Sequence, residues 1–255
     1  MNILVCLKQV PDSTVRVKVA PDAKSIVTDG ITWAISPYDE YAIELALEHK
    51  DADPGTTVSA LTVGPARARD ALRQALAMGC DDAAIVVGEA AGLGLARALA
   101  AAVRERTPDL VLCGRQASDD DQGFVGMALA EALGWPHVAS VTAFKAADGG
   151  GIEIWKEIEG GHEVWKASGP VLLTVQKSAK EPRYPSLPGI MKAKKKEIPE
   201  RALSDLGVDQ AGPVAEVVAM QPPPARGNGV ILKDADTGAL ATELARRLRD
   251  EAKVL

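Results

Sequence analysis

The sequence predicts an α/β protein built on a mostly parallel, doubly wound sheet. Short apolar runs of strand length alternate with helical apolar periodicity from residue 3 to residue 134, which is the order that βαβ units produce. Glycine and proline separate the runs, as expected at element ends. The chain has 255 residues, 47% of them hydrophobic and 25% charged, so it can bury one large core.

Strands and helices follow each other in regular order in this first part. Strands are predicted at 3–7, 58–63, 84–87 and 110–113. Ser36 followed by Pro37 predicts an N-cap and the first turn of a helix that reaches about His49. Three further helices begin near 68, 95 and 125, and end at Gly79, at Thr107-Pro108 and at Gly134.

The pattern changes after Pro136. Residues 152–158 and 163–166 flank Gly160-Gly161 in the manner of a β-hairpin, and residues 171–175 read as another strand. Beyond 176 the apolar periodicity is lost and prolines are frequent, until Leu240, Leu244 and Leu248 restore helical spacing.

Two parts are therefore expected, an α/β domain at 1–176 and a long C-terminal arm at 177–255. An arm of that length cannot bury enough of its own side chains to fold alone, so we expect it to wrap a partner subunit.

Composition and charge exclude several classes of protein. The net charge of −6 argues against a nucleic-acid binder, because phosphate neutralisation needs a basic face. Three scattered cysteines without CxxC spacing, and three histidines without carboxylates at ligand spacing, predict no metal site and no disulfide framework. No secretory or membrane-spanning run is present, so a cytoplasmic location is expected. The common NTPase, hydrolase and zincin motifs are missing, so no catalytic residue is predicted.

A candidate binding loop lies between a predicted strand and a predicted helix, in the segment GRQASDDDQGFVG at 114–126. Ligands of α/β sheets bind at the carboxyl ends of strands, and a helix N-terminus favours an anion such as phosphate. Gly123 and Gly126 would permit close approach of a ligand. The alternative is that Asp119, Asp120 and Asp121 only cap the following helix. Three carboxylates would also repel a phosphate unless they turn toward ribose hydroxyls.

A second feature is the basic run at 192–196, which follows an apolar stretch at 187–191. Such a run is usually a solvated face. Apolar residues beside positive charge also suit the docking of an acidic partner around an apolar anchor.

The sequence resembles the β subunit of the electron transfer flavoproteins over nearly its whole length. The most specific match is EPRYPSLPGIMKAKKKEI at 181–198, supported by LVCLKQVPD, VTDG, ALAMGCD and CGRQASDDD. The resemblance implies a Rossmann-like, adenine-nucleotide hydrolase-like fold that buries AMP. It also implies a heterodimer whose α subunit holds the redox-active FAD. Acyl-CoA dehydrogenases or similar flavoenzymes of fatty acid β-oxidation would reduce that FAD, which would then reduce a membrane quinone oxidoreductase.

The resemblance also assigns residues. Tyr38 would lie near the α-subunit flavin, Leu187 would anchor in the dehydrogenase, and lysines matching Lys192 and Lys195 are methylated in some members. The implied recognition residues are Leu187, Pro188, Ile190, Met191, Lys192 and Lys195. The implied AMP contacts are Cys6, Ser36, Pro37, Tyr38, Asp39, Val63, Gly114, Arg115, Gln116, Ala117, Ser118, Asp119, Asp120, Asp121, Gln122, Gly123, Phe124 and Val125.

Three alternatives remain open, and one of them, a stand-alone nucleotide sensor, would leave the long arm unexplained. In the electron-bifurcating branch a second FAD replaces AMP, and KQVPD and CGRQA are closer to that branch. However, Asp120 stands where that branch has glycine, and its charge and bulk disfavour a pyrophosphate. An enzyme of the adenine-nucleotide hydrolase-like class would need a pyrophosphate loop after the first strand, where Pro11 here removes a backbone donor.

Overall fold

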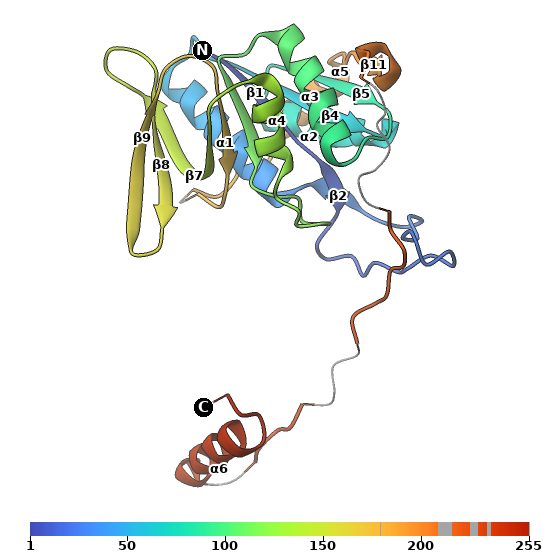
Figure 1. Ribbon diagram of the computed structural model, residues 1–255, viewed down its shortest axis with the longest axis vertical. Coiled ribbons are helices and arrows are strands. Elements are labelled where there is room, and N and C mark those ends of the chain that lie inside the picture. The colour runs from blue at the N-terminus through green and yellow to red at the C-terminus, as the bar shows by residue number, and fades with distance from the viewer. Residues whose placement is uncertain (179, 209–215, 225–228, 234–235, 255) are drawn as a thin grey trace. The chain divides into compact units, whose positions relative to one another are not determined.

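The computed structural model describes residues 1–178, 180–208, 216–224, 229–233 and 236–254. The chain divides into two compact units, Met1–Ala219 and Met220–Leu255, and each is described here by itself. Figure 1 shows the elements of both. No described helix combines the length and the apolarity needed to cross a membrane.

Nine strands of the first unit form one sheet, in the order β11-β5-β4-β1-β6-β10-β7-β8-β9 among the described residues (Figure 1). All neighbours are parallel except the two pairs that involve β8. The bounds are β1 Asn2–Cys6, β4 Thr57–Gly64, β5 Asp82–Val87, β6 Leu110–Gly114, β7 His137–Ala146, β8 Ile152–Ile158, β9 Gly161–Ala167, β10 Val171–Val175 and β11 Glu200–Ala202.

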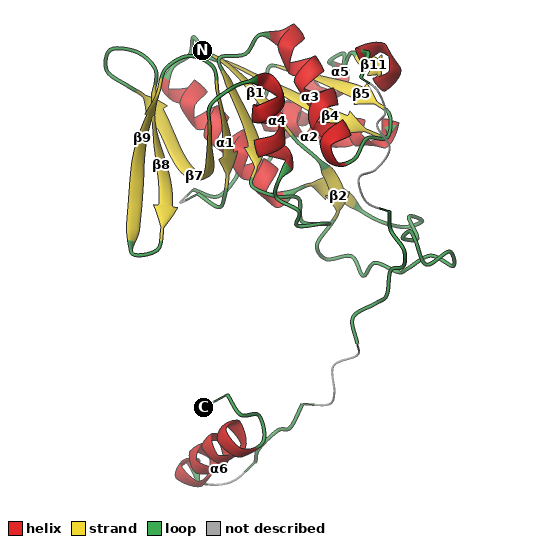
Figure 2. Ribbon diagram, in the orientation of Figure 1, coloured by secondary structure: helices red, strands yellow, loops and turns green. Residues whose placement is uncertain are grey.

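Helices cover both faces of this sheet (Figure 2). Ile3 and Val5 of β1 pack with α1 (Pro37–Ala52) and α2 (Arg69–Met78). Leu4 and Cys6 point to the opposite face and pack with α3 (Gly92–Arg106) and α4 (Val125–Leu133). This alternation follows from the two-residue period of a strand, and it gives the three layers of a doubly wound fold. The predicted fold class is confirmed.

The chain reverses its winding direction at β1. From β1 it passes through α1 to β4 and then β5 on one side, and from β5 it returns through α3 to β6 on the other side of β1. In open α/β sheets, ligands bind in the crevice at the carboxyl ends of the two strands that flank such a reversal. Here those ends are Cys6-Leu7-Lys8 and Gly114, which the register places side by side through the pair Cys6 and Cys113.

Several elements lie where no strand or helix was predicted. A small antiparallel sheet joins β2 (Gln9–Pro11) to β3 (Trp33–Ile35), and 3₁₀ turns occur at Ala66–Ala68 and Leu203–Leu206. The segment after residue 176 is also not wholly extended. Its helix α5 (Leu187–Lys195) packs on α2, and β11 extends the sheet beside β5. Ala193, Ile198 and Leu203 are buried in these contacts, so residues up to about 206 lie on the chain's own α/β unit.

The second unit contains one helix among its described residues, α6 (Thr237–Asp250). Asp236 caps it by accepting hydrogen bonds from the N–H groups of Gly238 (3.2 Å) and Ala239 (3.0 Å). No residue of α6 is buried. The division of the chain at residue 176 stays a prediction.

Candidate functional site

The carboxyl ends of β1 and β6 are joined by the side chain of Asp39, at the first turn of α1. Asp39 Oδ2 accepts a hydrogen bond from Lys8 N and Oδ1 accepts one from Gly114 N, each at 2.8 Å. Residue 114 must be glycine, because a Cβ there would lie 2.5 Å from Asp39 Oδ1. Burial raises the pKa of Asp39 to about 7, against the effect of both N–H groups and of the Lys8 charge. Asp39 therefore holds the crevice together and occupies two backbone donors.

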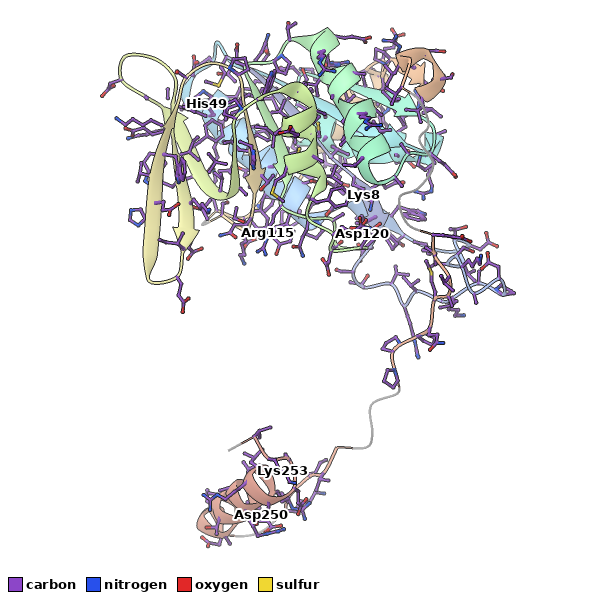
Figure 3. All side chains as sticks on the ribbon, in the orientation of Figure 1. Lys8, His49, Arg115, Asp120, Asp250 and Lys253 are labelled. Carbon is purple, nitrogen blue, oxygen red and sulfur yellow. The ribbon has the colours of Figure 1, made fainter. Side chains whose placement is uncertain are left out.

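Lys8 connects β1 to the acidic loop that follows β6. Its Nζ lies 2.8 Å from Asp119 Oδ1 and 3.0 Å from Asp120 Oδ2, and Figure 3 shows Lys8 and Asp120 beside each other. Burial lowers the pKa of Lys8, but the hydrogen bonds to Asp119 and Asp120 outweigh this, so the pKa lies above its ordinary value. Lys8 stays charged at neutral pH and offsets part of the acidic charge that would repel a phosphate.

The backbone of this loop is bent by two left-handed residues, Asp121 (φ 49°) and Gly123 (φ 67°). Asp121 Oδ1 accepts a hydrogen bond from Gln116 Nε2 at 2.7 Å, and Asp120 Oδ1 accepts one from Gln122 N at 3.2 Å. None of these carboxylates caps α4, whose N-cap position is Phe124 and which has no side-chain cap. The alternative that the three acids serve as helix caps is wrong, and the α4 N-terminus has no carboxylate on it.

Two thiols and one hydroxyl are buried close to these strand ends. Cys6 and Cys113 are buried neighbours on β1 and β6, and the hydrogen bond to Cys6 and burial raise the pKa of the Cys113 thiol. Ser36 is the N-cap residue of α1 and Pro37 follows it, as predicted, but the Ser36 Oγ makes no cap hydrogen bond. Among the described residues, Ser36 Oγ is the one buried side-chain oxygen without a partner.

The other predicted AMP contacts lie around the same strand ends. Pro37 is exposed and Tyr38 half-buried at the start of α1, and Val63 lies near the end of β4, which pairs with β1. Gly126 serves packing, since a Cβ there would lie 2.6 Å from Thr174 Cγ2 of β10. The loop itself is exposed or half-buried from Arg115 to Val125, and comprises Arg115, Gln116, Ala117, Ser118, Asp119, Asp120, Asp121, Gln122, Gly123, Phe124 and Val125.

The predicted recognition residues belong to another element, α5. Leu187 is 80% exposed and Met191 58% exposed, and Pro188, Ile190, Lys192 and Lys195 are also exposed. Ser186 caps this helix by accepting a hydrogen bond from Gly189 N at 3.1 Å. The apolar residues therefore point away from the domain while Ala193 fixes the helix to it.

Comparison with known proteins gives the family. The sequence matches the electron transfer flavoprotein domain over residues 24–206. It is 36% identical to the electron transfer flavoprotein subunit beta of Bradyrhizobium diazoefficiens and 38% identical to that of Bacillus subtilis, with 100% of each chain covered. It is 37% identical to the human protein of the same name, over 90% of this chain and 92% of that one.

The chain belongs to the electron transfer flavoprotein β-subunit family. Electron transfer flavoproteins bind a flavin or another nucleotide, and the crevice between β1 and β6 is where the geometry of this chain suits one. Related proteins include bacterial members and a mitochondrial one from rice.

Two residues of the crevice have roles that the sequence did not reveal. Lys8 directly follows the strand predicted at 3–7 and no role was predicted for its side chain. Asp39 was expected as a ligand contact, and in the structure it links the ends of two strands. The available signal for Lys8 was its place directly after the first strand, next to the strand that precedes three aspartates. Among the described residues, no group of three or more His, Cys, Asp or Glu side chains is arranged to hold a metal ion.

Proposed function

We propose that this chain is the β subunit of a heterodimeric electron transfer flavoprotein and binds AMP in the crevice between β1 and β6. The observation that carries the proposal is the arrangement at the switch point, where Lys8 offsets Asp119 and Asp120 beside an α4 N-terminus that no side chain caps. Free N–H groups at such a terminus suit a phosphate.

The crevice favours a single phosphate over the diphosphate of a second FAD. Asp39 occupies the N–H groups of Lys8 and Gly114, and those of Asp121 and Gln122 donate within the loop. The donors that remain for a phosphate therefore lie at the start of α4, which no side chain caps. Asp120, which stands where a glycine would ease the approach of a pyrophosphate, is held in place by Lys8. The buried Ser36 Oγ offers a further polar atom near the start of α1.

The AMP has a structural role in this proposal, and the FAD of the α subunit carries the electrons. The residues of this chain bind, orient and shield the AMP. Cys6, Val63 and Gly114 edge the base, and the loop from Arg115 to Val125 holds the sugar and phosphate. The chain itself contributes no catalytic residue.

The exposed face of α5 supports docking of an electron-donating flavoenzyme of the acyl-CoA dehydrogenase type. Leu187 and Met191 are exposed apolar residues next to Lys192 and Lys195, which suits an acidic surface with an apolar pocket. The FAD would then pass the electrons to a membrane quinone oxidoreductase. The part of the chain beyond the segment that packs on its own α/β unit, with α6 in it, contributes the surface that meets the α subunit.

A count of bound nucleotides tests this proposal. The chain is co-expressed with an α subunit, the purified complex is denatured, and released FAD and AMP are quantified by chromatography. We expect one FAD and one AMP per heterodimer. Two FAD and no AMP would make the complex a bifurcating one, and a complex without any adenine nucleotide beyond the α-subunit FAD would refute binding in the crevice.

A further inference from the structure

One face of α1 holds the segment that leads from β10 into α5. Tyr41, Glu44, Glu48 and Asp51 are spaced three, four and three residues apart, so they lie on the same side of the helix. Each of them binds a residue of the segment 177–183. The segment has no helix or strand of its own among its described residues.

The centre of this contact is the pair of Glu44 and Arg183. The Glu44 side chain is 0% exposed, which is unusual for a carboxylate and requires a partner. Arg183 supplies it as a fork, with Nε 2.9 Å from Oε2 and Nη2 3.0 Å from Oε1, and its backbone N–H donates to Oε2 at 3.0 Å. Burial acts to raise the pKa of Glu44, but the hydrogen bonds from Arg183 outweigh it and keep the pKa below its ordinary value.

Weaker contacts surround this pair. Lys180 Nζ lies 3.0 Å from Glu48 and 3.5 Å from Glu44, and the Tyr41 hydroxyl donates to Glu181 at 2.6 Å. Among the described residues of 177–183, only Ser178 is buried. Apolar packing therefore cannot fix the direction of the segment, and the buried ion pair is the contact that can.

The far end of α5 is fixed separately. The Arg73 guanidinium donates to the backbone oxygens of Ala193 and Lys196, and a Cβ at Gly189 would lie 2.5 Å from the Ala77 oxygen of α2. Leu187, the first residue of α5, therefore lies between an anchor on α2 and the anchor on α1. Its orientation depends on both.

We propose that Glu44 is a positioning residue for partner recognition: through Arg183 it fixes the segment that presents Leu187 to the electron-donating flavoenzyme. This inference rests on the proposed docking role of α5. The Glu44 side chain itself is buried, so it acts only through Arg183, the residue that it holds.

The test uses the complete heterodimer with Glu44→Gln, which keeps the shape of the side chain and removes its charge. The donor is an acyl-CoA dehydrogenase reduced by its acyl-CoA, and the rate of flavin reduction in the heterodimer gives KM for the donor and kcat. We expect KM to rise about tenfold with kcat changed less than about twofold, because docking is impaired and electron transfer within the docked complex is not. AMP and FAD content should be unchanged, and trypsin should cut faster after Lys177, Lys180 and Arg183.

Two other variants make the outcome decisive. Glu48→Gln is the matched control, since among the described residues Glu48 pairs with Lys180 alone, near the surface, and such a pair contributes little. Its KM should stay at the wild-type value. Arg183→Lys keeps the charge but loses the fork, and its KM should rise by about threefold, less than in Glu44→Gln. Arg183→Lys also tests the positioning role on its own if Glu44→Gln fails to fold.

An unchanged KM in both Glu44→Gln and Arg183→Lys, or an equal rise in Glu48→Gln, would overturn the positioning role. Leu187→Ala separates this failure from that of the docking proposal. If Leu187→Ala raises KM and Glu44→Gln does not, docking through α5 stands and the role of Glu44 is wrong. If Leu187→Ala leaves KM unchanged, docking through α5 is wrong and the positioning role fails with it.

Discussion

Lys8 is the residue on which the charge balance of the crevice depends. Replacing it by Gln leaves Asp119 and Asp120 without their cation, so we expect the affinity for AMP to fall by about tenfold or more. If Lys8 acts by offsetting these acids, Asp119→Asn and Asp120→Asn in the Lys8→Gln background should restore binding. Calorimetric titration with AMP after removal of bound nucleotide measures this.

The opposite result would show that Lys8 binds the phosphate directly. In that case the two Asn substitutions alone should strengthen binding by freeing Lys8, and the triple variant should stay weak. Lys24→Gln is the control, because Lys24 forms an exposed ion pair with Glu216 and is not among the residues assigned to the crevice. Its affinity for AMP should match that of the wild type.

The raised pKa of the Asp39 carboxyl predicts that the stability of the chain depends on pH. Its pKa is raised from 3.8 to about 7 in the folded chain, so between about pH 4 and pH 7 the folded state keeps a proton that the unfolded state has lost. Stability contributed by this group should therefore fall as pH rises through that window, by up to about 4 kcal/mol, and level off above pH 7. Urea unfolding of the full-length chain and of Asp39→Asn across pH 4 to 8 gives the difference.

In the difference between the unfolding free energies of the two proteins, the contributions of all other titrating groups cancel, provided that both proteins unfold in one transition. A difference in stability that does not vary with pH would contradict the prediction. It would mean that the N–H groups of Lys8 and Gly114 keep the carboxylate ionised in spite of its burial.

At the scale of elements, periodicity was a sound guide wherever an element buries one continuous face. The predicted helix at 125–133 and strand at 171–175 coincide with α4 and β10, whose buried residues recur at the expected spacing. β7 was missed because only Val141 of its ten residues is fully buried, so the strand has no strong alternation. β2, β3 and β11 have three residues each, and sequence periodicity cannot be recognised in so short a run.

The helix α5 shows a different limit. Its apolar residues Leu187, Ile190 and Met191 are exposed, so the rule that apolar residues face the core gave no helix there. The family resemblance identified this segment instead. The contacts that hold it, such as Arg183 with Glu44, join residues 139 positions apart and cannot be read from local sequence.

The sequence located the candidate site by its place between a strand and a helix, and did not reveal the side-chain contacts within it. The glycine-bounded loop between strand and helix lies at the winding reversal, as expected from adjacent strand ends, and its role in binding stays a prediction. The ion pair of Lys8 with Asp119 spans 111 positions and depends on the register of β1 with β6. Its existence followed only from the assembled sheet.

At the scale of the whole molecule, the second unit raises the question of what stabilises α6. This helix has 14 residues, and isolated helices of that length are marginal in water. Leu240, Leu244 and Leu248 recur every fourth residue, and Leu244 is 50% exposed. A helix with an apolar stripe and no buried residue needs another surface to cover that stripe, and we propose that the α subunit provides it.

We therefore predict that Leu244→Asp together with Leu248→Asp lowers the affinity for the α subunit by on the order of a hundredfold, a loss typical of central interface residues. Co-purification with a tagged α subunit and analytical ultracentrifugation measure it. Thr242→Asp, on the opposite side of α6, adds one such charge and should assemble normally. The variant chain should keep the circular dichroism of its α/β unit, since residues 1–219 contain the entire sheet. Normal assembly of the double variant would show that the apolar stripe of α6 does not bind the α subunit.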